Sequence, residues 1–374
     1  MRIVHYYPTA REDSGVTLAL WSWARAQARA GIDVAVLHGG SSLEPGRRLS
    51  ADDEPTPGLA ESVVPHRGIG RLTRHPVALE RWLRRGDILI LHEGWVPANH
   101  VAAGAARRAG IPYVVMPHGV YEPAWRSYLR PPLRLREHFE RRLLERAAAV
   151  HAFFDSELPG IRRLAPGASF IVLPTGFDVP DAHWVGGGGY LSWIGRYDPR
   201  HKGLDILIDA LVLLPAERRP RLRLHGYDFR GGLEALRRRI ADRAIGDWVH
   251  LGGVISGPAK TEFLRHADGY VHPSRWESYG IALVENLALG VPCVVSSSVH
   301  LASDLTEYDA AILTEPNPRD LADALLRLGQ DPRGTGVNGR RLVSERLNWA
   351  NIIPAFVAST EHLASQDGRT RTPV

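Results

Sequence analysis

The feature of this sequence that most constrains its fold is an alternation of strand and helix patterns, which occurs twice. In the first half, strands are predicted over 2–7, 33–38, 87–92, 112–116 and 150–154, and helices over 14–30, 97–109 and 133–148. Residues 40–75, rich in proline, glycine and polar side chains, are predicted as a loop. Strands that alternate with helices build a parallel sheet with helices on both faces. An α/β fold is therefore expected.

The alternation restarts after residues 177–189, which end in four consecutive glycines, a composition typical of a flexible junction. Strands are predicted over 190–194, 222–225, 249–251, 269–272, 292–296 and 311–313, and helices over 204–214, 233–244, 259–267, 280–290, 318–328 and about 337–365. A chain of 374 residues can hold two such domains. The expected order is an N-terminal domain (1–178), a linker (179–189), a C-terminal domain (190–340), helices that pack back on the N-terminal domain (341–365) and a disordered tail (366–374).

The composition indicates where the protein is located in the cell and which class of partner it binds. The N-terminus enters a strand directly, no run of about 18 apolar residues occurs, and Cys293 is the single cysteine. These features indicate a cytoplasmic protein. The net charge of +5 favours an anionic partner, such as a nucleotide, a phospholipid or a nucleic acid, without choosing among them. No known nucleic-acid-binding motif is present, so a nucleic-acid partner is not expected.

The most informative motif runs from Val271 to Ser298 and reads as strand, polar loop, helix and strand. At about 100° per residue, Glu277 and Glu285 would lie within roughly 80° of each other around one helix. We expect Glu277 at the mouth of that helix and Glu285 two turns inside it. A helix mouth has unpaired N–H groups and a positive dipole end, which suit phosphate, and carboxylates accept hydrogen bonds from hydroxyls. The motif therefore predicts a site for a nucleotide-sugar.

A second motif, Gly195 to Gly203, follows the first strand of the second domain. Its cations Arg196 and Lys202 suit phosphate oxygens, and its position at a strand's carboxyl end favours a ligand site over a solvated basic turn. It is not a P-loop, because the Gly-x-x-x-x-Gly-Lys-Ser/Thr pattern is absent.

Together these motifs resemble glycosyltransferase family four. The resemblance rests on Gly-Arg-x-Asp-x-x-x-Lys-Gly at 195–203, Pro-Ser-Arg-Trp-Glu-Ser-Tyr-Gly-Ile-Ala-Leu-Val-Glu at 273–285 and Ala-Leu-Gly-Val-Pro-Cys-Val-Val-Ser at 288–296. It covers most of 190–330 and is weaker in the first half, at 117–119 and 174–178. It implies the GT-B fold, in which two Rossmann-like doubly wound domains face each other across a cleft. It also implies a retaining, metal-independent enzyme that moves a hexose-type sugar from a UDP- or GDP-sugar to a hydroxyl of a glycan, a lipid-linked or a small-molecule acceptor.

The resemblance also implies residue roles. Arg196 and Lys202 would hold the donor diphosphate, Glu277 and His118 would contact the transferred sugar, and Glu285 would bind the ribose. The remaining donor contacts would come from Gly15, from the main chain around Val254, and from Ser278, Tyr279, Gly280 and Ile281. Two motifs depart from the family pattern, which often has paired glycines in the first loop and Pro-Asn-Gly later. Here the first loop reads Asp13-Ser14-Gly15-Val16, and the later motif reads Pro174-Thr175-Gly176.

Alternatives remain open. On pattern alone, His118 is as well explained by a structural hydrogen bond as by a site role. A GT-B epimerase, a phosphorylase or a non-catalytic nucleotide-sugar-binding scaffold would keep the same donor motifs. The segment 125–146 interleaves arginines with apolar side chains, so it is either a solvated helix face or a peripheral contact with an anionic membrane. Neither an Asp-x-Asp nor a Cys/His cluster occurs, and no metal cofactor is expected.

Overall fold

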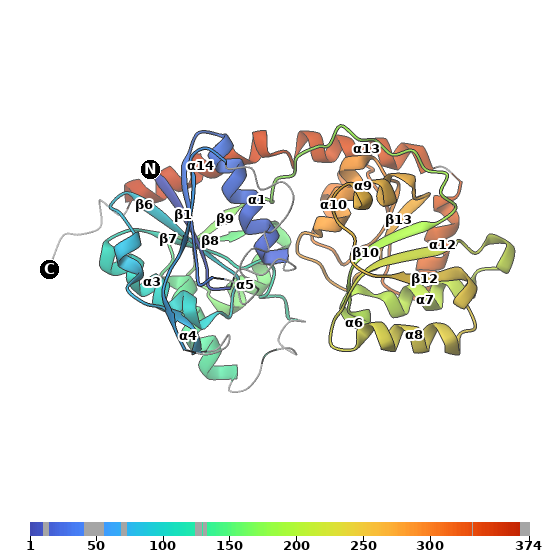
Figure 1. Cartoon of the computed structure of the whole chain (residues 1–374), viewed down its shortest axis with the longest axis horizontal. Coiled ribbons are helices and arrows are strands. Elements are labelled where there is room, and N and C mark those ends of the chain that lie inside the picture. Colours follow the sequence, from blue (N-terminus) through green and yellow to red (C-terminus); the bar gives the residue numbers. More distant parts are fainter. Residues whose placement is uncertain are drawn as a thin grey trace. The chain divides into compact units, whose positions relative to one another are not determined.

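The computed structural model describes residues 1–9, 15–40, 56–68, 73–123, 129, 133–330 and 332–366. The chain divides into two compact units (Figure 1). Unit 1 comprises Met1–Gly176 and Trp349–Val374, and unit 2 comprises Phe177–Asn348. The division falls at residues 176/177 and 348/349, so the chain leaves unit 1, builds unit 2 and returns.

Unit 1 contains a sheet of parallel strands in the order β3-β2-β1-β6-β7-β8-β9. The strands are β1 (Arg2–Tyr7), β2 (Asp33–His38), β3 (Leu59–Val63), β6 (Asp87–His92), β7 (Tyr113–Met116), β8 (Ala149–Ala152) and β9 (Phe170–Val172). From the central β1 the chain first builds one side of the sheet and then crosses to β6 on the other. This is the doubly wound order, in which ligands bind at the carboxyl ends of the strands where the order reverses.

The helices of unit 1 are α1 (Gly15–Arg29), α3 (Pro97–Ala109), α4 (Leu133–Glu145), α5 (Leu158–Leu164) and α14 (Trp349–Gln366). Helix α3 shows why its bounds were predictable: proline stands at its first position, and Gly110 ends it with φ 67°. The C-terminal α14 packs on α1, where the Trp23 ring lies 4.9 Å from that of Trp349 and 5.0 Å from that of Phe356. These buried rings attach the end of the chain to unit 1.

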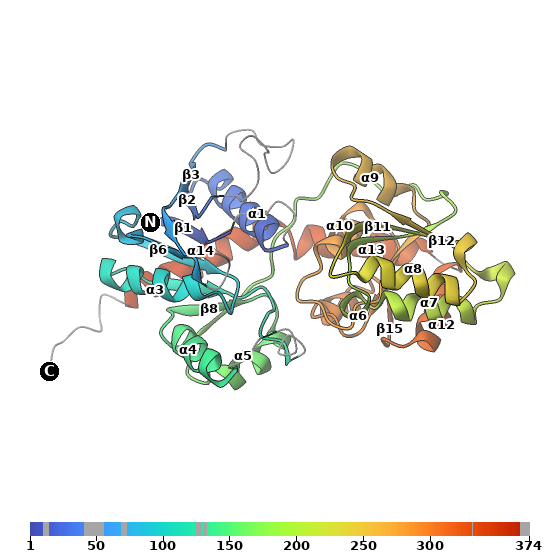
Figure 2. The same cartoon turned by 60° about the horizontal axis from the view of Figure 1, so that its bottom comes forward.

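Unit 2 repeats the architecture with strand order β12-β11-β10-β13-β14-β15, again parallel. The strands are β10 (Leu191–Tyr197), β11 (Leu222–Asp228), β12 (Val249–Gly252), β13 (Gly269–His272), β14 (Cys293–Ser296) and β15 (Ile312–Thr314). The helices are α6 (Pro199–Lys202), α7 (Leu204–Leu213), α8 (Gly232–Asp242), α9 (Gly257–His266), α10 (Ile281–Leu289), α11 (Ala302–Glu307), α12 (Pro318–Leu328) and α13 (Pro332–Glu345). Within this unit, α9 and α10 cover one face of the sheet and α7 and α8 the other (Figures 1 and 2).

The predicted α/β fold with two Rossmann-like domains is confirmed, and several elements keep their predicted bounds, among them β1, β2, β6, β13, α3 and α12. The prediction of a loop over 40–75 is wrong in part, because β3 continues the sheet and β4 (His66–Arg67) pairs with β5 (His75–Pro76). Strand β3 lies at the sheet edge with both faces largely exposed. It therefore lacks the apolar alternation by which a strand is recognised.

The predicted linker is held against unit 2 rather than free. Trp184 donates a backbone hydrogen bond of 2.8 Å to Leu289, and its indole N–H donates one of 2.7 Å to the carbonyl of Ala267. Gly188 bonds the carbonyl of His266 at 2.9 Å. Three of the four glycines have positive φ, so glycine here fits a bent path along the unit surface.

Part of the predicted membrane-contact segment (125–128 and 130–132) and most of the predicted tail (367–374) lie outside the described residues. The described part of the segment is mostly α4, on which Leu135 is 54% and Phe139 49% exposed. Gln366, assigned to the tail, belongs to α14. Of the described helices, none combines the length and apolarity that crossing a membrane requires.

Candidate functional site

The loops after β10 and β13 carry both predicted donor motifs. These strands are neighbours, paired at Leu191 with Gly269 and at Ser192 with Tyr270, and the strand order of unit 2 reverses between them. Their carboxyl ends, Tyr197 and His272, therefore deliver both loops to the edge where doubly wound sheets bind ligands.

The loop after β10 is shaped by a cap and a glycine. Asp198 caps the short α6, accepting a 3.2 Å hydrogen bond from the backbone of His201. Gly203 has φ 63°, and a Cβ atom there would overlap the carbonyl oxygen of Pro273 in the other loop. Only glycine allows the two loops to pack this closely.

His201 links the two motifs. Its ring stacks on the Trp276 ring at 4.3 Å, and its Nε2 lies 2.9 Å from the carbonyl oxygen of Trp276. Burial, with Lys202 and Arg196 nearby, lowers its pKa to about 3, so the ring is neutral. Its Nδ1 then accepts a 2.7 Å hydrogen bond from the Arg196 guanidinium, which also lies over the Phe229 ring at 4.5 Å. Arg196 is held in place by these two contacts.

Lys202 and Glu277 form an ion pair between the two loops, with both side chains 14% exposed. His272, at the end of β13, lies with its Nε2 3.5 Å from the same Glu277 oxygen. Burial raises the pKa of Glu277, but Lys202 and these histidines outweigh it and hold the pKa well below its usual range. The site therefore holds an ionised carboxylate against a lysine.

The helical relation expected between Glu277 and Glu285 is wrong, because only Glu285 lies on the helix. Glu277 precedes the helix, and its backbone carbonyl accepts a 3.0 Å hydrogen bond from His300. Helix α10 begins only at Ile281, after Gly280 with φ 76°, so Glu285 is one turn inside it rather than two. The helix cannot extend back to Glu277, because Gly280 lies in the left-handed region and a residue there cannot continue an α-helix. Glu285 pairs with Lys260 of α9 at 2.5 Å.

The mouth of α10 carries the other predicted donor contacts. The carbonyl of Gly280 accepts hydrogen bonds of 2.8 Å from Leu283 and 3.0 Å from Val284. Tyr279 is buried, and Ser278 and Ile281 are half-buried. The first-turn N–H groups of a helix make an anion site. Arg196, Lys202, Glu277, Glu285 and the mouth thus come from adjoining segments of unit 2. Val254 stands after β12 and is 68% exposed.

The other two predicted site residues belong to unit 1. His118 follows β7 with φ 57°, and its Nε2 lies 2.9 Å from Nδ1 of His92. Glu93 and Trp95, after the neighbouring β6, also have positive φ, at 64° and 61°. Such left-handed non-glycine residues are strained and often cluster at functional sites. Gly15 is exposed and begins α1, while Asp13 and Ser14 lie outside the described residues.

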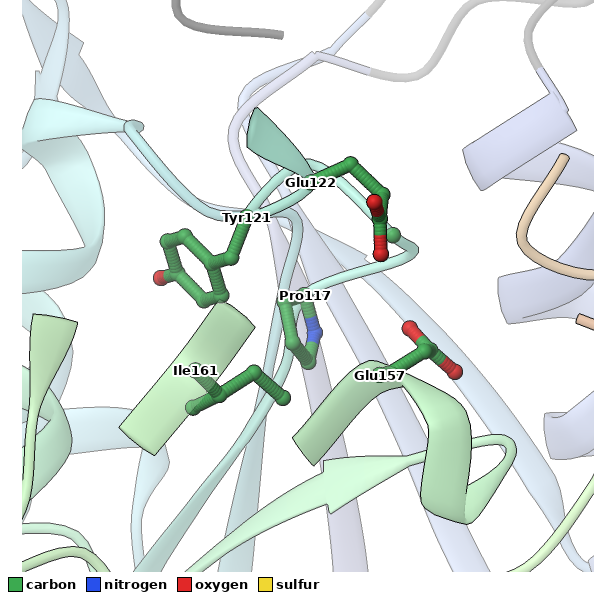
Figure 3. A pocket seen from close by; sticks show the side chains of 6 residues that line it. Pro117, Tyr121, Glu122, Glu157 and Ile161 are labelled. Carbon is green, nitrogen blue, oxygen red and sulfur yellow. The ribbon is translucent and has the colours of Figure 1, made fainter. Parts of the chain in front are cut away.

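A small pocket lies beside His118 in unit 1. It is lined by Pro117, Gly119, Tyr121, Glu122, Glu157 and Ile161. Figure 3 shows the carboxyl groups of Glu122 and Glu157 pointing toward one another. Glu157 uses one oxygen to accept backbone hydrogen bonds of 2.7 Å from Phe153 and 3.1 Å from Phe154. No cluster of three or more metal-binding side chains occurs among the described residues.

Sequence reasoning missed His201 as the support of Arg196, His272 and Lys260 as partners of the two glutamates, and the histidines behind His118. The position of His272 at the end of β13 was a readable signal, because strand ends deliver side chains to the site. Lys260 gave none, since it stands 25 residues before its partner Glu285.

Two family models match the chain. The model described as "Glycosyl transferase 4-like domain" matches residues 14–176, and the model described as "Glycosyl transferases group 1" matches residues 188–331. The two matches together span well over half of the chain.

Curated relatives bear names of the same class. The chain is 28% identical over 353 residues to a phosphatidyl-myo-inositol mannosyltransferase of Mycobacterium leprae, with 87% of this chain and 90% of that protein covered. It is also 28% identical to the O-antigen chain mannosyltransferase B of Escherichia coli, over 44% of this chain and 43% of that protein. The second match spans less than half of either protein.

Solved structures share the fold. Sucrose-phosphate synthase from Thermosynechococcus elongatus superimposes with a TM-score of 0.78 at 21% identity, covering 98% of this chain and 99% of that one. Anabaena HepE, solved in complex with UDP-glucose, has a TM-score of 0.77 at 17% identity, covering 97% and 100%. At these identities the likeness shows the fold alone. With a glycosyltransferase model matching each unit and mannosyltransferases among its relatives, the chain belongs to glycosyltransferase family four and is a glycosyltransferase of the GT-B fold.

Proposed function

We propose that this glycosyltransferase moves a hexose from a UDP- or GDP-sugar to a hydroxyl acceptor, with retention of the anomeric configuration and without a metal ion. The observation that carries the proposal is the ion pair between Lys202 and Glu277 next to the mouth of α10. It places an ammonium group, a carboxylate that can accept hydrogen bonds from hydroxyls, and a helix N-terminus at the point where the strand order of unit 2 reverses. Binding a sugar diphosphate requires these three groups.

The roles divide by chemistry. Arg196 and Lys202 would bind the diphosphate, together with the backbone N–H groups of Tyr279, Gly280 and Ile281. The carboxylate of Glu277 would accept hydrogen bonds from the transferred sugar. Further contacts would come from Glu285 to the ribose, from the main chain around Val254 to the base, from Ser278 to the phosphates, and from Gly15 and His118 of unit 1 to the phosphates and the sugar.

The cations supply the chemistry that a metal would otherwise supply. Sugar transfer passes through an oxocarbenium-like state while negative charge grows on the leaving diphosphate. Because Arg196 is already held by His201 and Phe229, it can stabilise that charge without reorganising. Transfer on one face of the sugar, with the leaving phosphate taking the acceptor's proton, would retain the configuration.

Glu285 would bind the ribose without losing its contact with Lys260. In the structure its carboxylate faces Lys260 at 2.5 Å. A carboxylate has about four lone-pair sites, so it can keep this lysine and still accept bonds from two vicinal ribose hydroxyls. Lys260 would hold the Glu285 carboxylate in place while it binds the diol.

The names of similar proteins support the choice of donor. Two relatives are named as mannosyltransferases, and one structural neighbour was solved with UDP-glucose. The acceptor classes proposed here are a glycan, a lipid-linked or a small-molecule hydroxyl.

The test is turnover of a panel of UDP- and GDP-hexoses in excess EDTA, with and without candidate acceptors, followed by proton NMR of the product's anomeric centre. We expect acceptor-dependent release of nucleoside diphosphate and the donor's anomeric configuration in the product. An inverted product, or activity restored only by a divalent cation, would contradict the mechanism. Donor conversion without an acceptor would instead favour an epimerase, and phosphate-dependent cleavage a phosphorylase.

A further inference from the structure

Behind His118, three buried side chains form one hydrogen-bonded chain through unit 1. His118 Nε2 lies 2.9 Å from His92 Nδ1, and His92 Nε2 lies 2.8 Å from His5 Nδ1. His5 Nε2 lies 2.7 Å from the amide oxygen of Gln27. His5, His92 and Gln27 are fully buried. The four come from β1, α1, β6 and the loop after β7, so the chain runs between separate elements.

The three imidazoles are neutral, because burial lowers the pKa of His5 to about 4, of His118 to about 3, and of His92 well below its usual value. A neutral imidazole has one N–H and one lone pair on its two nitrogens. Each ring that donates on one side must therefore accept on the other. All the hydrogen bonds of the chain consequently point in the same direction, and the group at its inner end sets that direction.

The inner end is the carbonyl oxygen of Gln27, which can only accept. His5 therefore donates from Nε2 and accepts at Nδ1 from His92. His92 in turn accepts at Nδ1 from Nε2–H of His118. Every ring is then the Nε2–H tautomer, which free imidazole side chains also prefer. The Nδ1 lone pair of His118 is left over, and it has no hydrogen-bond partner among the residues that the structure describes.

We propose that Gln27, His5 and His92 are positioning residues that fix His118 as a hydrogen-bond acceptor at Nδ1, selecting a ligand that donates from a hydroxyl. The inference rests on the proposed function in assigning that hydroxyl to the transferred sugar. A ligand oxygen without a proton, such as a phosphate oxygen or a methyl ether, is disfavoured at this atom. The positive φ of His118 fits this role, because a strained backbone conformation persists only where the surrounding contacts hold the residue in place.

The direct test is the tautomer of His118 in the full chain, read from long-range proton–nitrogen correlation spectra of histidine-labelled protein. The His118 signals are assigned by their loss in His118→Gln. We expect a protonated Nε2 and an unprotonated Nδ1, with the two nitrogen resonances far apart. In His92→Phe and in the near-isosteric Gln27→Met, we expect the separation to shrink as both tautomers become populated. His66→Gln is the matched control, since His66 bonds Tyr6 and Val64 in the same unit but stands outside the chain.

Activity gives the second readout. His92→Phe and Gln27→Met are expected to lower kcat/KM about three- to tenfold, the effect of one neutral hydrogen bond, and His66→Gln to leave it unchanged. A protonated Nδ1 in the wild type, or a His118 tautomer unaffected by both variants, would overturn the proposal. These spectra need no turnover. If the tautomer is as expected but no sugar is transferred, the proposed function fails. The proposal that Gln27, His5 and His92 fix the tautomer of His118 then still stands.

Discussion

At the scale of single residues, the site is organised by charges that lie opposite one another. Lys202 faces Glu277 and Lys260 faces Glu285, while the neutral His201 holds Arg196. Glu277 is thereby held as an ionised carboxylate before a ligand arrives. Such preorganisation lets an enzyme act on developing charge without first moving its own groups.

Lys202→Ala is expected to cut turnover at least about tenfold, because removing one preorganised donor typically costs on the order of 10² to 10³ in rate. It also leaves Glu277 without its cation, so the pKa of that carboxyl should rise. The matched control is Arg243→Ala, which removes a cation of unit 2 that pairs with Asp209 at 3.0 Å. Steady-state rates and circular dichroism of both variants make the comparison. Wild-type turnover in a folded Lys202→Ala protein would remove Lys202 from the site.

The buried histidines make unit 1 sensitive to acid. Burial lowers the pKa of His151 and of His5 to about 4, against about 6.5 in the unfolded chain. A lowered folded pKa contributes stability that is full above pH 6.5 and is lost as the pH falls toward 4. At pH 5 each such histidine should cost roughly 2 kcal/mol of unfolding free energy relative to neutral pH.

Urea unfolding at pH values between 7.5 and 5, followed by circular dichroism, measures how the free energy of unfolding depends on pH. His151→Phe should be less stable at neutral pH, because it loses the 2.8 Å bond to the carbonyl of Leu173, yet it should lose less stability on acidification. An equal pH dependence of stability in the variant and the wild type would show that folding does not lower the pKa of His151.

At the scale of elements, the alternation of strands and helices could be predicted because apolar periodicity reports buried faces directly. Strand β6, for example, is buried at all six residues and was placed correctly. The start of α10 was predicted within one residue. The helical relation expected between Glu277 and Glu285 was wrong, because Glu277 lies in an extended segment that bridges to Val299 from another part of the chain. The hydrogen-bonded histidines behind His118 could not be predicted either, because bonded partners such as His5 and His92 are 87 positions apart in the sequence.

The close packing of the two donor loops depends on Gly203. Gly203→Ala should destabilise unit 2 by at least about 1–2 kcal/mol, because alanine is strained at positive φ and its Cβ would overlap the carbonyl of Pro273. Gly246→Ala is the control, since nothing lies within 4 Å of a Cβ there. Thermal unfolding compares the two, and equal melting temperatures would contradict the packing argument.

Helix α4 offers a test of membrane contact. Leu135 and Phe139 are four residues apart, so they share one face, and both are about half exposed. If this face contacts anionic lipid, the Leu135→Ser/Phe139→Ser double variant should sediment several-fold less with phosphatidylglycerol vesicles than the wild type. Absence of wild-type sedimentation would leave α4 as a solvated helix.

At the scale of the whole molecule, the chain is two doubly wound units with separate contributions. Unit 2 brings nearly all predicted donor contacts to one sheet edge, and unit 1 contributes His118 with its buried support. The sequence predicted that the two donor motifs would lie at strand ends, because their residues form two short, patterned segments, and the structure places both motifs after the neighbouring strands β10 and β13. The pocket next to His118 was not predicted, since its polar groups, such as Glu122 and Glu157, come from segments without a shared pattern.

The central claim is that unit 2 binds a nucleotide-diphosphate sugar through Lys202 and the mouth of α10. Calorimetric titration of the full chain with UDP- and GDP-hexoses in EDTA tests it most directly. We predict saturable binding of at least one donor, weakened at least about tenfold in Lys202→Ala and unchanged in Arg243→Ala. At 100 times its dissociation constant, that donor should stabilise the protein by about 2.7 kcal/mol. Failure of every donor to bind, or equal binding by Lys202→Ala, would contradict the account.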